Sequence, residues 1–512
     1  MLGKIIKKLF TAPSAPELEP DIEPGGDSVL KSLDKNAEAL DALFLDVDIM
    51  LSRRFANAEN DSVRFILYHS DGVSDMRMIN EHIVEPLMGA HLFADDSLLE
   101  QIKNEALSAV DFEEADKFSA IIKDVCYGDT ALFIDGCNKA LVISSKAFSL
   151  RAVSEPEGEK VLSGPREGFT ESLMTNLSLV RRRIRTNELK MKMKNLGSET
   201  KTGVCVAYLD NIVNKNLLAE VNRRLEKVDI DSVLDGNYLV EFIAEHSRFG
   251  VSTVGTTERP DSVASKLLEG RIAIFTDGSP VVLTVPLLFW ENFQSSEDYY
   301  TPFLYASYSR FLRLLSFIMT ITVPSIYIAV VAFHHDILPS PLMLSIARSQ
   351  KDVPLPAAVE CFVMLLLFDI LREAGVRMPS HVGQALSIVG ALVIGQAAVE
   401  ARLVSAPMII VVAITGITIL MVPNLSTTSL LARYFCLSLA SAFGLVGMMV
   451  GITILFVHIL QLESFGVPVF MPIDSLREQD VKDTFIRAPW PKMLERMRPY
   501  SYNIRRQGGQ KS

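Results

Sequence analysis

The sequence of 512 residues lacks the motifs of the common enzyme classes, of disulfide-stabilised proteins and of nucleic-acid-binding proteins. It has no GxxxxGK[ST] phosphate loop, no GxSxG nucleophile turn and no HExxH zinc motif, so we predict no catalytic residues, no cofactor and no metal site. The five cysteines form no CxxC pair, which argues for reduced thiols rather than zinc ligands or disulfides. With a net charge of −11, the chain is not expected to bind nucleic acid.

The N-terminal stretch also lacks the features of a signal peptide. The apolar run within Met1–Phe10 is too short for a signal-peptide core, and Pro- and Glu-rich sequence follows in place of a small-residue cleavage site. We therefore predict a disordered leader over residues 1–36 and a cytoplasmic location for the soluble part that follows.

Hydrophobic and charged residues are both abundant. Hydrophobic residues make up 49% of the chain, and its mean hydropathy is +0.26, yet 22% of the residues are charged. Such a mixture favours segregation along the chain. We predict an α/β cytoplasmic region of two related subdomains, followed by an all-α polytopic membrane domain.

A nine-residue frame indicates the repeat in the soluble part. Gly128–Gly136 and Gly270–Gly278 both read as a buried strand that enters an Asp-Gly hairpin turn. The predicted subdomains are residues 37–153 and 201–297. Between them, residues 154–200 are predicted to form a linker and a basic helix, which is either solvated or directed toward acidic groups or anionic lipid.

The membrane domain is predicted over residues 298–463, with spans at about 314–333, 384–400, 404–422 and 434–460. The tail, 464–512, is rich in lysine and arginine, so the positive-inside rule places it with the soluble part. Both ends on one side require an even number of crossings. The fifth apolar helix, 354–371, is therefore predicted to be embedded or re-entrant.

That fifth helix carries charges that are costly in lipid unless they pair or meet water. We predict three groups of candidate residues there and in the neighbouring helices. Glu360, Asp369 and Gln396 are candidates for an ion pathway, although Glu360 could instead pair with another helix and Asp369 with Arg372 or Arg377. The candidates for anchoring the helix are Arg372, Glu373 and Arg377. The small residues predicted to allow close helix packing are Gly390, Gly395, Gly444, Gly447 and Gly451.

Distinctive motifs occur in both parts of the chain. Those of the soluble part and the tail are Gly164-Pro-Arg-Glu-Gly-Phe169, Glu258-Arg-Pro-Asp261, Asp298-Tyr-Tyr300 and Ser464-Phe-Gly-x-Pro468. Those of the membrane part are Pro354-x-Pro356 with Glu360, Leu371-Arg-Glu-Ala-Gly-x-Arg-x-Pro379 and Gly395-Gln-Ala-Ala-Val-Glu-Ala401. Together these motifs closely resemble the GerA family of spore germination proteins, specifically the A-type subunit of nutrient germinant receptors. From position alone, Asp261 is expected to cap the helix that follows it.

The resemblance implies a multi-pass subunit of the receptor in the inner membrane of bacterial endospores, with its N-terminal region and tail on the cytoplasmic side. Its implied partners are a permease-like B subunit, a lipoprotein C subunit, further copies of itself and membrane lipid. The resemblance further implies a nutrient-gated cation channel that triggers germination. Two alternatives stay open: a receptor-independent paralogue that amplifies germination, and a secondary transporter, against which the lack of an inverted repeat argues.

Overall fold

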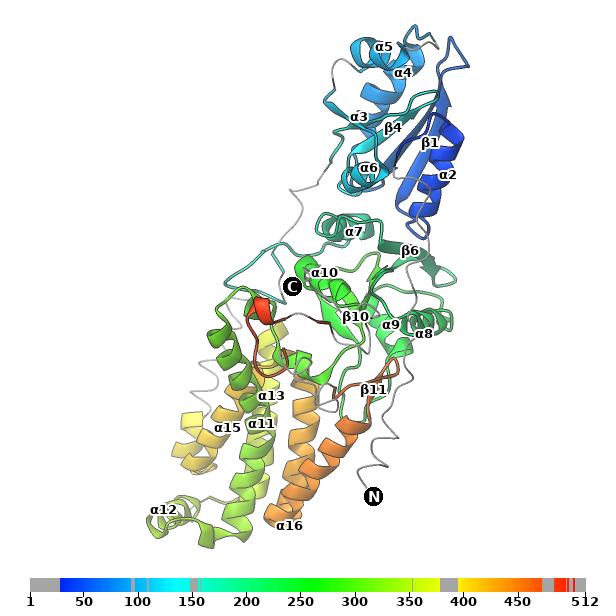
Figure 1. The fold of residues 1–512 in the computed structure, drawn as a ribbon. Helices are drawn as coiled ribbons and strands as arrows, with labels where there is room; N and C mark the ends of the chain where they lie inside the picture. The colour runs from blue at the N-terminus through cyan, green and yellow to red at the C-terminus, as the bar shows by residue number, and fades with distance from the viewer. Residues whose placement is uncertain are drawn as a thin grey trace. The chain divides into compact units, whose positions relative to one another are not determined.

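The computed structural model describes residues 28–93, 97–107, 110–147, 155–156, 158–351, 353–377, 395–471, 483–493, 495–496 and 501. The chain forms two compact units (Figure 1). The first ends at residue 148 and also includes Arg185–Asn187, and the second takes the rest of the chain.

The first unit is a five-stranded antiparallel sheet with helices on both faces. Its strands lie in the order β1-β2-β4-β5-β3, and the apolar side chains of β2, β4 and β5 pack under the helices. Its elements are α2 (Leu33–Leu43), β1 (Met50–Ala56), β2 (Arg64–Ser70), α3 (Met76–Ile79), η1 (Asn80–Val84), α4 (Glu85–Gly89), α5 (Leu98–Gln101), η2 (Ile102–Ala106), β3 (Phe112–Ala115), α6 (Phe118–Val125), β4 (Thr130–Ile134) and β5 (Ala140–Ile143).

The second unit begins with another five-stranded sheet, in the order β6-β7-β9-β10-β8, which repeats the strand order of the first. Helices α8 and α9 cover one face, and α7 and α10 pack against the sheet as well. The elements are α7 (Leu173–Arg181), β6 (Leu189–Leu196), β7 (Thr202–Leu209), α8 (Lys215–Leu225), α9 (Gly236–Ile243), β8 (Gly255–Thr257), α10 (Pro260–Leu268), β9 (Ile272–Thr276), β10 (Val282–Val285), η3 (Phe289–Phe293) and η4 (Ser296–Tyr299).

The hairpin aspartates have the same role in both sheets. Asp135 accepts a hydrogen bond from the backbone N–H of Leu33 at 3.3 Å, and Asp277 accepts one from Leu173 at 3.1 Å. Each carboxylate thus satisfies a free amide in the first turn of the helix that opens its subdomain. The Asp-Gly pairs serve turn formation and helix capping.

Two predicted boundaries are wrong. The expected basic helix is α7 followed by strand β6, which pairs with β7 along its whole length. Leucine and methionine alternate with lysine through residues 189–194, and this period of two suits a strand rather than a helix. The second subdomain therefore begins before residue 201. Structure in the first unit also begins before residue 37, since α2 starts at Leu33 and Ser28 pairs with Lys117.

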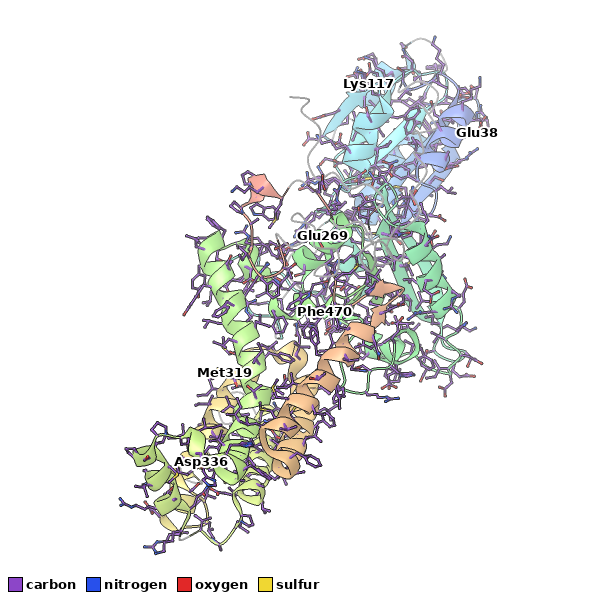
Figure 2. All side chains as sticks on the ribbon, turned by 60° about the horizontal axis from the view of Figure 1, so that its bottom comes forward. Glu38, Lys117, Glu269, Met319, Asp336 and Phe470 are labelled. Carbon is purple, nitrogen blue, oxygen red and sulfur yellow. The ribbon has the colours of Figure 1, made fainter. Side chains whose placement is uncertain are left out.

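The rest of the second unit is helical. Its elements are α11 (Phe303–Phe333), η5 (His335–Ile337), α12 (Ser340–Gln350), α13 (Ala357–Arg377), α15 (Ala406–Leu420), η6 (Pro423–Leu425), α16 (Ser426–Gln461), β11 (Glu463–Ser464), β12 (Val467–Pro468) and η7 (Trp490–Lys492). Among the described residues, two apolar stretches are long enough to cross a membrane, Phe303–Phe333 and Pro423–Gln461. In Figure 2, Met319 marks the middle of α11 and Asp336 the loop beyond it. Of the predicted span 384–400, only the helical residues 395–400 are described.

The prediction of one span over residues 434–460 is wrong, because α16 reverses direction at Gly444. This glycine has φ 62° and ψ −143°, a conformation that only glycine adopts readily. A β-carbon at Gly447 would lie 2.1 Å from the carbonyl oxygen of Leu439, across the turn. Phe249 contacts both Phe435 and His458, which lie on opposite arms. Figure 1 draws the arms as neighbouring orange helices.

This reversal removes the counting argument about the fifth helix. The even-crossing rule was applied with residues 434–460 as one crossing, whereas the structure has two antiparallel helices there, 426–443 and 445–461. Parity therefore no longer requires the charged helix α13 to stop short of crossing. Gly447 and Gly451 pack the two arms together, because a β-carbon at Gly451 would lie 3.2 Å from the sulfur of Cys436.

Candidate functional site

The second α/β subdomain is joined to α11 through the buried carboxylate of Asp298. Asp298 accepts hydrogen bonds from the backbone N–H of Ser295 at 3.1 Å, from Arg310 Nε at 3.0 Å and from Arg313 Nη1 at 3.0 Å. Arg310 is 2% exposed, and the two arginines are three residues apart on one face of α11. Charge-assisted bonds of this kind are stronger than neutral ones. One carboxylate therefore ties the first membrane helix to the subdomain.

The tail binds the same place. Arg310 Nη1 donates to the carboxylate Oδ1 of Asp483 at 2.9 Å, and the hydroxyl of Tyr299 donates to its Oδ2 at 2.9 Å. Burial raises the pKa of Tyr299 well above its ordinary value, and the negative charge of Asp483 raises it further. Tyr299 is thus a neutral donor. The backbone N–H of Arg487 donates to Ser307 on α11 at 3.1 Å, so the tail is held at several points.

The next tyrosine links this region to two loops of the subdomain. The hydroxyl of Tyr300 donates to Asp261 Oδ2 at 2.7 Å, and Arg259 Nη2 donates to the same oxygen at 2.9 Å. Burial and this bond to Asp261 raise the pKa of the Tyr300 hydroxyl. A β-carbon at Gly164 would lie 2.5 Å from the tyrosine ring, so the contact requires glycine. The expectation that Asp261 caps α10 is wrong, because the N-cap residue is Arg259. Asp261 instead accepts the hydrogen bonds from Tyr300 and Arg259.

The chain that leaves α16 also contacts the subdomain. Ser464 Oγ donates to the carbonyl of Thr253 at 2.6 Å and accepts from the backbone N–H of Leu287 at 3.1 Å. Phe465 and Val467 are part of the apolar core beside the sheet. Both α11 and the end of α16 are thus fastened to one subdomain. We call this region, built on Asp298–Tyr300, Asp261, Arg310, Asp483 and Ser464, the junction.

The junction brings together sequence motifs that lie far apart in the chain. The motifs at 164–169, 258–261, 298–300 and 464–468 each supply at least one of its contacts. These motifs were recognised in the sequence, but no partner was predicted for Asp298 or Arg310. Sequence analysis missed Asp483 entirely, since one aspartate in a polar tail carries no distinguishing pattern.

Within the membrane part, Glu360 caps a helix. It is 1% exposed, and its Oε1 accepts from the backbone N–H of Ser405 at 2.6 Å and from the Ser405 hydroxyl at 2.7 Å. Ser405 immediately precedes α15, so Glu360 of α13 meets the positive end of the α15 dipole. Among the described residues, Glu360 Oε2 has no hydrogen-bond partner. The structure thus gives Glu360 a partner on another helix while leaving one carboxylate oxygen unused.

Asp369, on the same helix as Glu360, pairs with an arginine that sequence analysis missed. Arg433 Nη2 donates to Asp369 Oδ2 at 2.6 Å, and the hydroxyl of Tyr434 donates to the same oxygen at 2.8 Å. Arg433 is fully buried. The partners expected for Asp369 were Arg372 and Arg377, but the pair instead joins α13 to α16. Arg433 is the lone Lys, Arg, Asp or Glu of α16, and a lone charge in an apolar run was the available signal.

The other candidate residues are dispersed. Gln396 is exposed and donates to Glu400 Oε1 at 3.0 Å, Arg372 is half-buried, and Glu373 is exposed. Gly395 contacts Ile409. The side chain of Arg377 and all of Gly390 lie outside the described residues. Within the described part of the chain, no three His, Cys, Asp or Glu side chains are close enough together to hold a metal ion.

Comparison with known proteins identifies relatives along most of the chain. The family model described as Bacillus/Clostridium GerA spore germination protein matches residues 38–499. The uncharacterized membrane protein YfkQ of Bacillus subtilis (strain 168) is 40% identical over 472 residues, covering 92% of this chain and 91% of that protein. Spore germination protein KA of the same strain is 38% identical over 462 residues, covering 90% and 85%.

One solved structure is also similar. It is the N-terminal domain of the A subunit of the Bacillus megaterium spore germinant receptor GerK3, at 30% sequence identity and a TM-score of 0.41. The match covers 51% of this chain and 97% of that one.

Proposed function

The chain belongs to the GerA family of spore germination proteins, and on this premise we propose that it is the A subunit of a spore germinant receptor. In this role it acts in the spore inner membrane with a permease-like B subunit and a lipoprotein C subunit. The family match over residues 38–499, which includes the soluble subdomains and the membrane helices alike, carries the proposal.

The membrane part is proposed to conduct cations when nutrient is sensed. Two carboxylates on α13, Glu360 and Asp369, support this, because carboxylates concentrate cations in a narrow low-dielectric passage. Asp369 is neutralised by Arg433, which leaves Glu360 as the uncompensated carboxylate of the two. Since Glu360 is covered by Ser405 in the single chain, cation access requires α13 to move away from the start of α15. We propose this separation as the gating step.

The junction is proposed to carry the signal between the soluble and membrane parts. Asp298 holds α11, and Ser464 holds the end of α16, against the same subdomain. A displacement of that subdomain therefore displaces the first and last membrane helices together. Close-packed contacts of this kind transmit shifts because they are not continuously deformable.

Deletion of the gene is expected to abolish germination of purified spores in response to one class of nutrients and to leave other classes effective. The measurement is loss of optical density and release of potassium across a panel of amino acids, sugars and nucleosides. A uniform slowing with every nutrient would instead indicate a paralogue that amplifies germination. That alternative is kept because the similar protein YfkQ is named only as a membrane protein.

Two substitutions at Glu360 separate charge from capping. Glu360→Gln keeps an acceptor oxygen for both Ser405 bonds but removes the charge, whereas Glu360→Ala removes both. If Glu360 faces permeating cations, the glutamine variant retains wild-type stability, and its nutrient-triggered potassium release falls at least tenfold. The alanine variant is expected to lose about 1–3 kcal/mol of stability as well.

The outcomes at Glu360 are decisive when the amount of protein in the membrane is matched. Wild-type potassium release in the glutamine variant, with reduced stability only in the alanine variant, would leave Glu360 as a helix cap and remove it from the ion path. Ser438→Ala serves as a control, because Ser438 is exposed and its hydroxyl bonds only within its own helix, to the carbonyl of Tyr434.

A further inference from the structure

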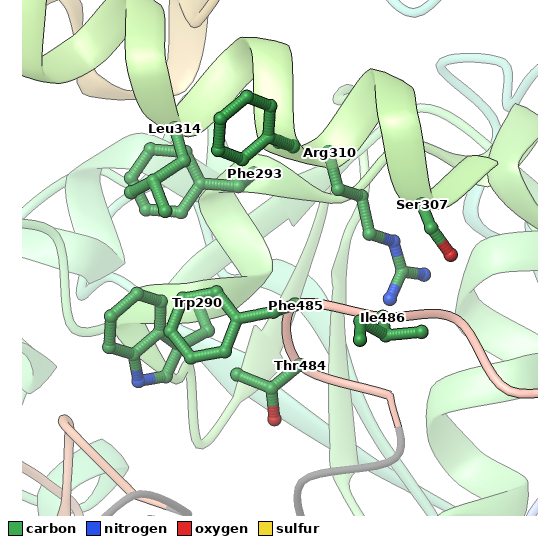
Figure 3. A pocket seen from close by; sticks show the side chains of 9 residues that line it. Trp290, Phe293, Ser307, Arg310, Leu314, Thr484, Phe485 and Ile486 are labelled. Atoms are coloured by element: carbon green, nitrogen blue, oxygen red, sulfur yellow. The ribbon is translucent and has the colours of Figure 1, made fainter. Parts of the chain in front are cut away.

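A small cavity lies beneath the tail at the start of α11. Its volume is about 120 Å³, and Figure 3 shows its walls. They come from three segments distant in the sequence: the η3 turn, the first turns of α11 and the tail. The lining residues are Trp290, Phe293, Ser307, Arg310, Phe311, Leu314, Thr484, Phe485 and Ile486.

The chemistry of the walls selects an uncharged apolar occupant. Aromatic rings dominate the lining, and the rings of Trp290 and Phe485 lie 4.5 Å apart. Arg310 is the one charged side chain in this lining, and its Nε and Nη1 are already bonded to Asp298 and Asp483. Its remaining nitrogen, Nη2, is covered by protein atoms, so it is not available to a ligand. The lining also holds the hydroxyls of Ser307 and Thr484, but six of its nine side chains are apolar, so the lining favours an apolar occupant.

The volume selects the size of the occupant. An engineered protein cavity of ~150 Å³ lined by apolar side chains stays dry and takes up benzene or xenon. The cavity here is of similar size and most of its lining side chains are apolar, so a six-membered ring or a molecule of equal bulk fits. An intact lipid does not fit.

The outer wall of the cavity is exposed and apolar. Phe311 is 58% exposed, and with Leu304, Tyr308 and Leu315 it forms an exposed apolar stripe along α11. The spacing of these residues, at intervals of three and four, puts them on one side of the helix. A small apolar molecule thus meets an apolar surface along α11 at the outer wall of the cavity.

We propose that this cavity binds a small uncharged apolar molecule, of benzene size or less. The occupant fills the space between the tail residues Thr484–Ile486 and α11, and so strengthens the hold of the tail on the membrane helix. This inference concerns packing in a single chain and does not depend on the proposed ion conduction.

Benzene binding to the full-length protein in lipid nanodiscs tests the proposal. Benzene at ten times its dissociation constant is expected to raise the thermal unfolding midpoint by roughly 2 °C, because a ligand that binds only the folded state stabilises it. Hydrogen exchange of the Arg487 amide, which is bonded to Ser307, is expected to slow several-fold. If neither quantity changes up to saturating benzene, the proposal is overturned.

Two neighbouring substitutions locate the effect. Leu314→Phe adds a ring to the cavity wall and is expected to abolish the benzene response, while Leu315→Phe makes the same change at an exposed position outside the lining and preserves it. An unchanged benzene response in Leu314→Phe would overturn the assignment. If that variant fails to fold, xenon pressurised into crystals of the wild-type protein decides the matter. Xenon in the cavity supports the proposal, and xenon found only elsewhere, or lipid density in the cavity, refutes it.

Discussion

Replacing Asp298 with alanine is expected to lower the stability of the second unit by about 3–5 kcal/mol, which is the cost of leaving buried charges without their partner. Arg310 is 2% exposed and would keep only its bonds to Asp483, while Arg313 would lose its carboxylate. The measurement is thermal or denaturant unfolding of the purified full-length protein, followed by tryptophan fluorescence, because Trp290 packs beside the junction.

A graded series makes this expectation specific to charge. Asp298→Asn keeps an acceptor for the Ser295 amide but removes the negative charge. Its stability should therefore lie between that of the wild type and that of the alanine variant. Glu297→Ala is the matched control, since the neighbouring carboxylate is only partly buried, and a change within about 0.5 kcal/mol is expected. A loss below about 1 kcal/mol for Asp298→Ala would show that the junction does not hold α11.

The pair of Asp369 and Arg433 predicts the second large effect. Asp369→Leu leaves a fully buried guanidinium without its carboxylate, and Arg433→Met leaves a carboxylate of which the side chain is only 13% exposed. Each single change is expected to cost about 3–5 kcal/mol. The double variant should recover most of the loss, because an apolar pair of similar volume replaces both charges and leaves none unpaired.

Unfolding of the four proteins in one detergent measures this cycle. The expected coupling between the two sites is about 2 kcal/mol or more, since the residues are in direct contact. Tyr434→Phe removes only the hydroxyl that donates to Asp369 and is expected to cost about 1 kcal/mol. Strictly additive losses in the double variant would mean that the pair does not link α13 to α16.

Features with a short period along the chain could be predicted from the sequence. The paired frames at 128–136 and 270–278 indicated two related sheets, because a strand and its hairpin turn are encoded by adjacent residues. The segment at 189–194 has a period of two that was available in the sequence, but its positive charge suggested a helix. The strand β6 forms there because it pairs with β7 and buries Leu189 and Met191.

The hairpin of α16 shows where hydropathy fails. Residues 434–460 are apolar throughout, and apolarity is the same for one long helix and for two short ones that fold back on each other. The reversal depends on Gly444 and on the close approach of Gly447 and Gly451 to the other arm. Glycine at these positions was predicted to allow close helix packing, and the structure also uses it for packing. No local feature therefore distinguished a single packed helix from a helical hairpin.

The sequence by itself determined the order of an α/β part and an apolar helical part, the charged character of α13 and the membership of the GerA family, because composition and motifs are local properties. Only the tertiary structure decided which partner each charge has. Asp369 meets Arg433 across 64 residues, and Arg310 meets Asp483 across 173. Such contacts follow from the packing of whole helices, so no window of the chain encodes them. That same packing places four separated motifs in one junction.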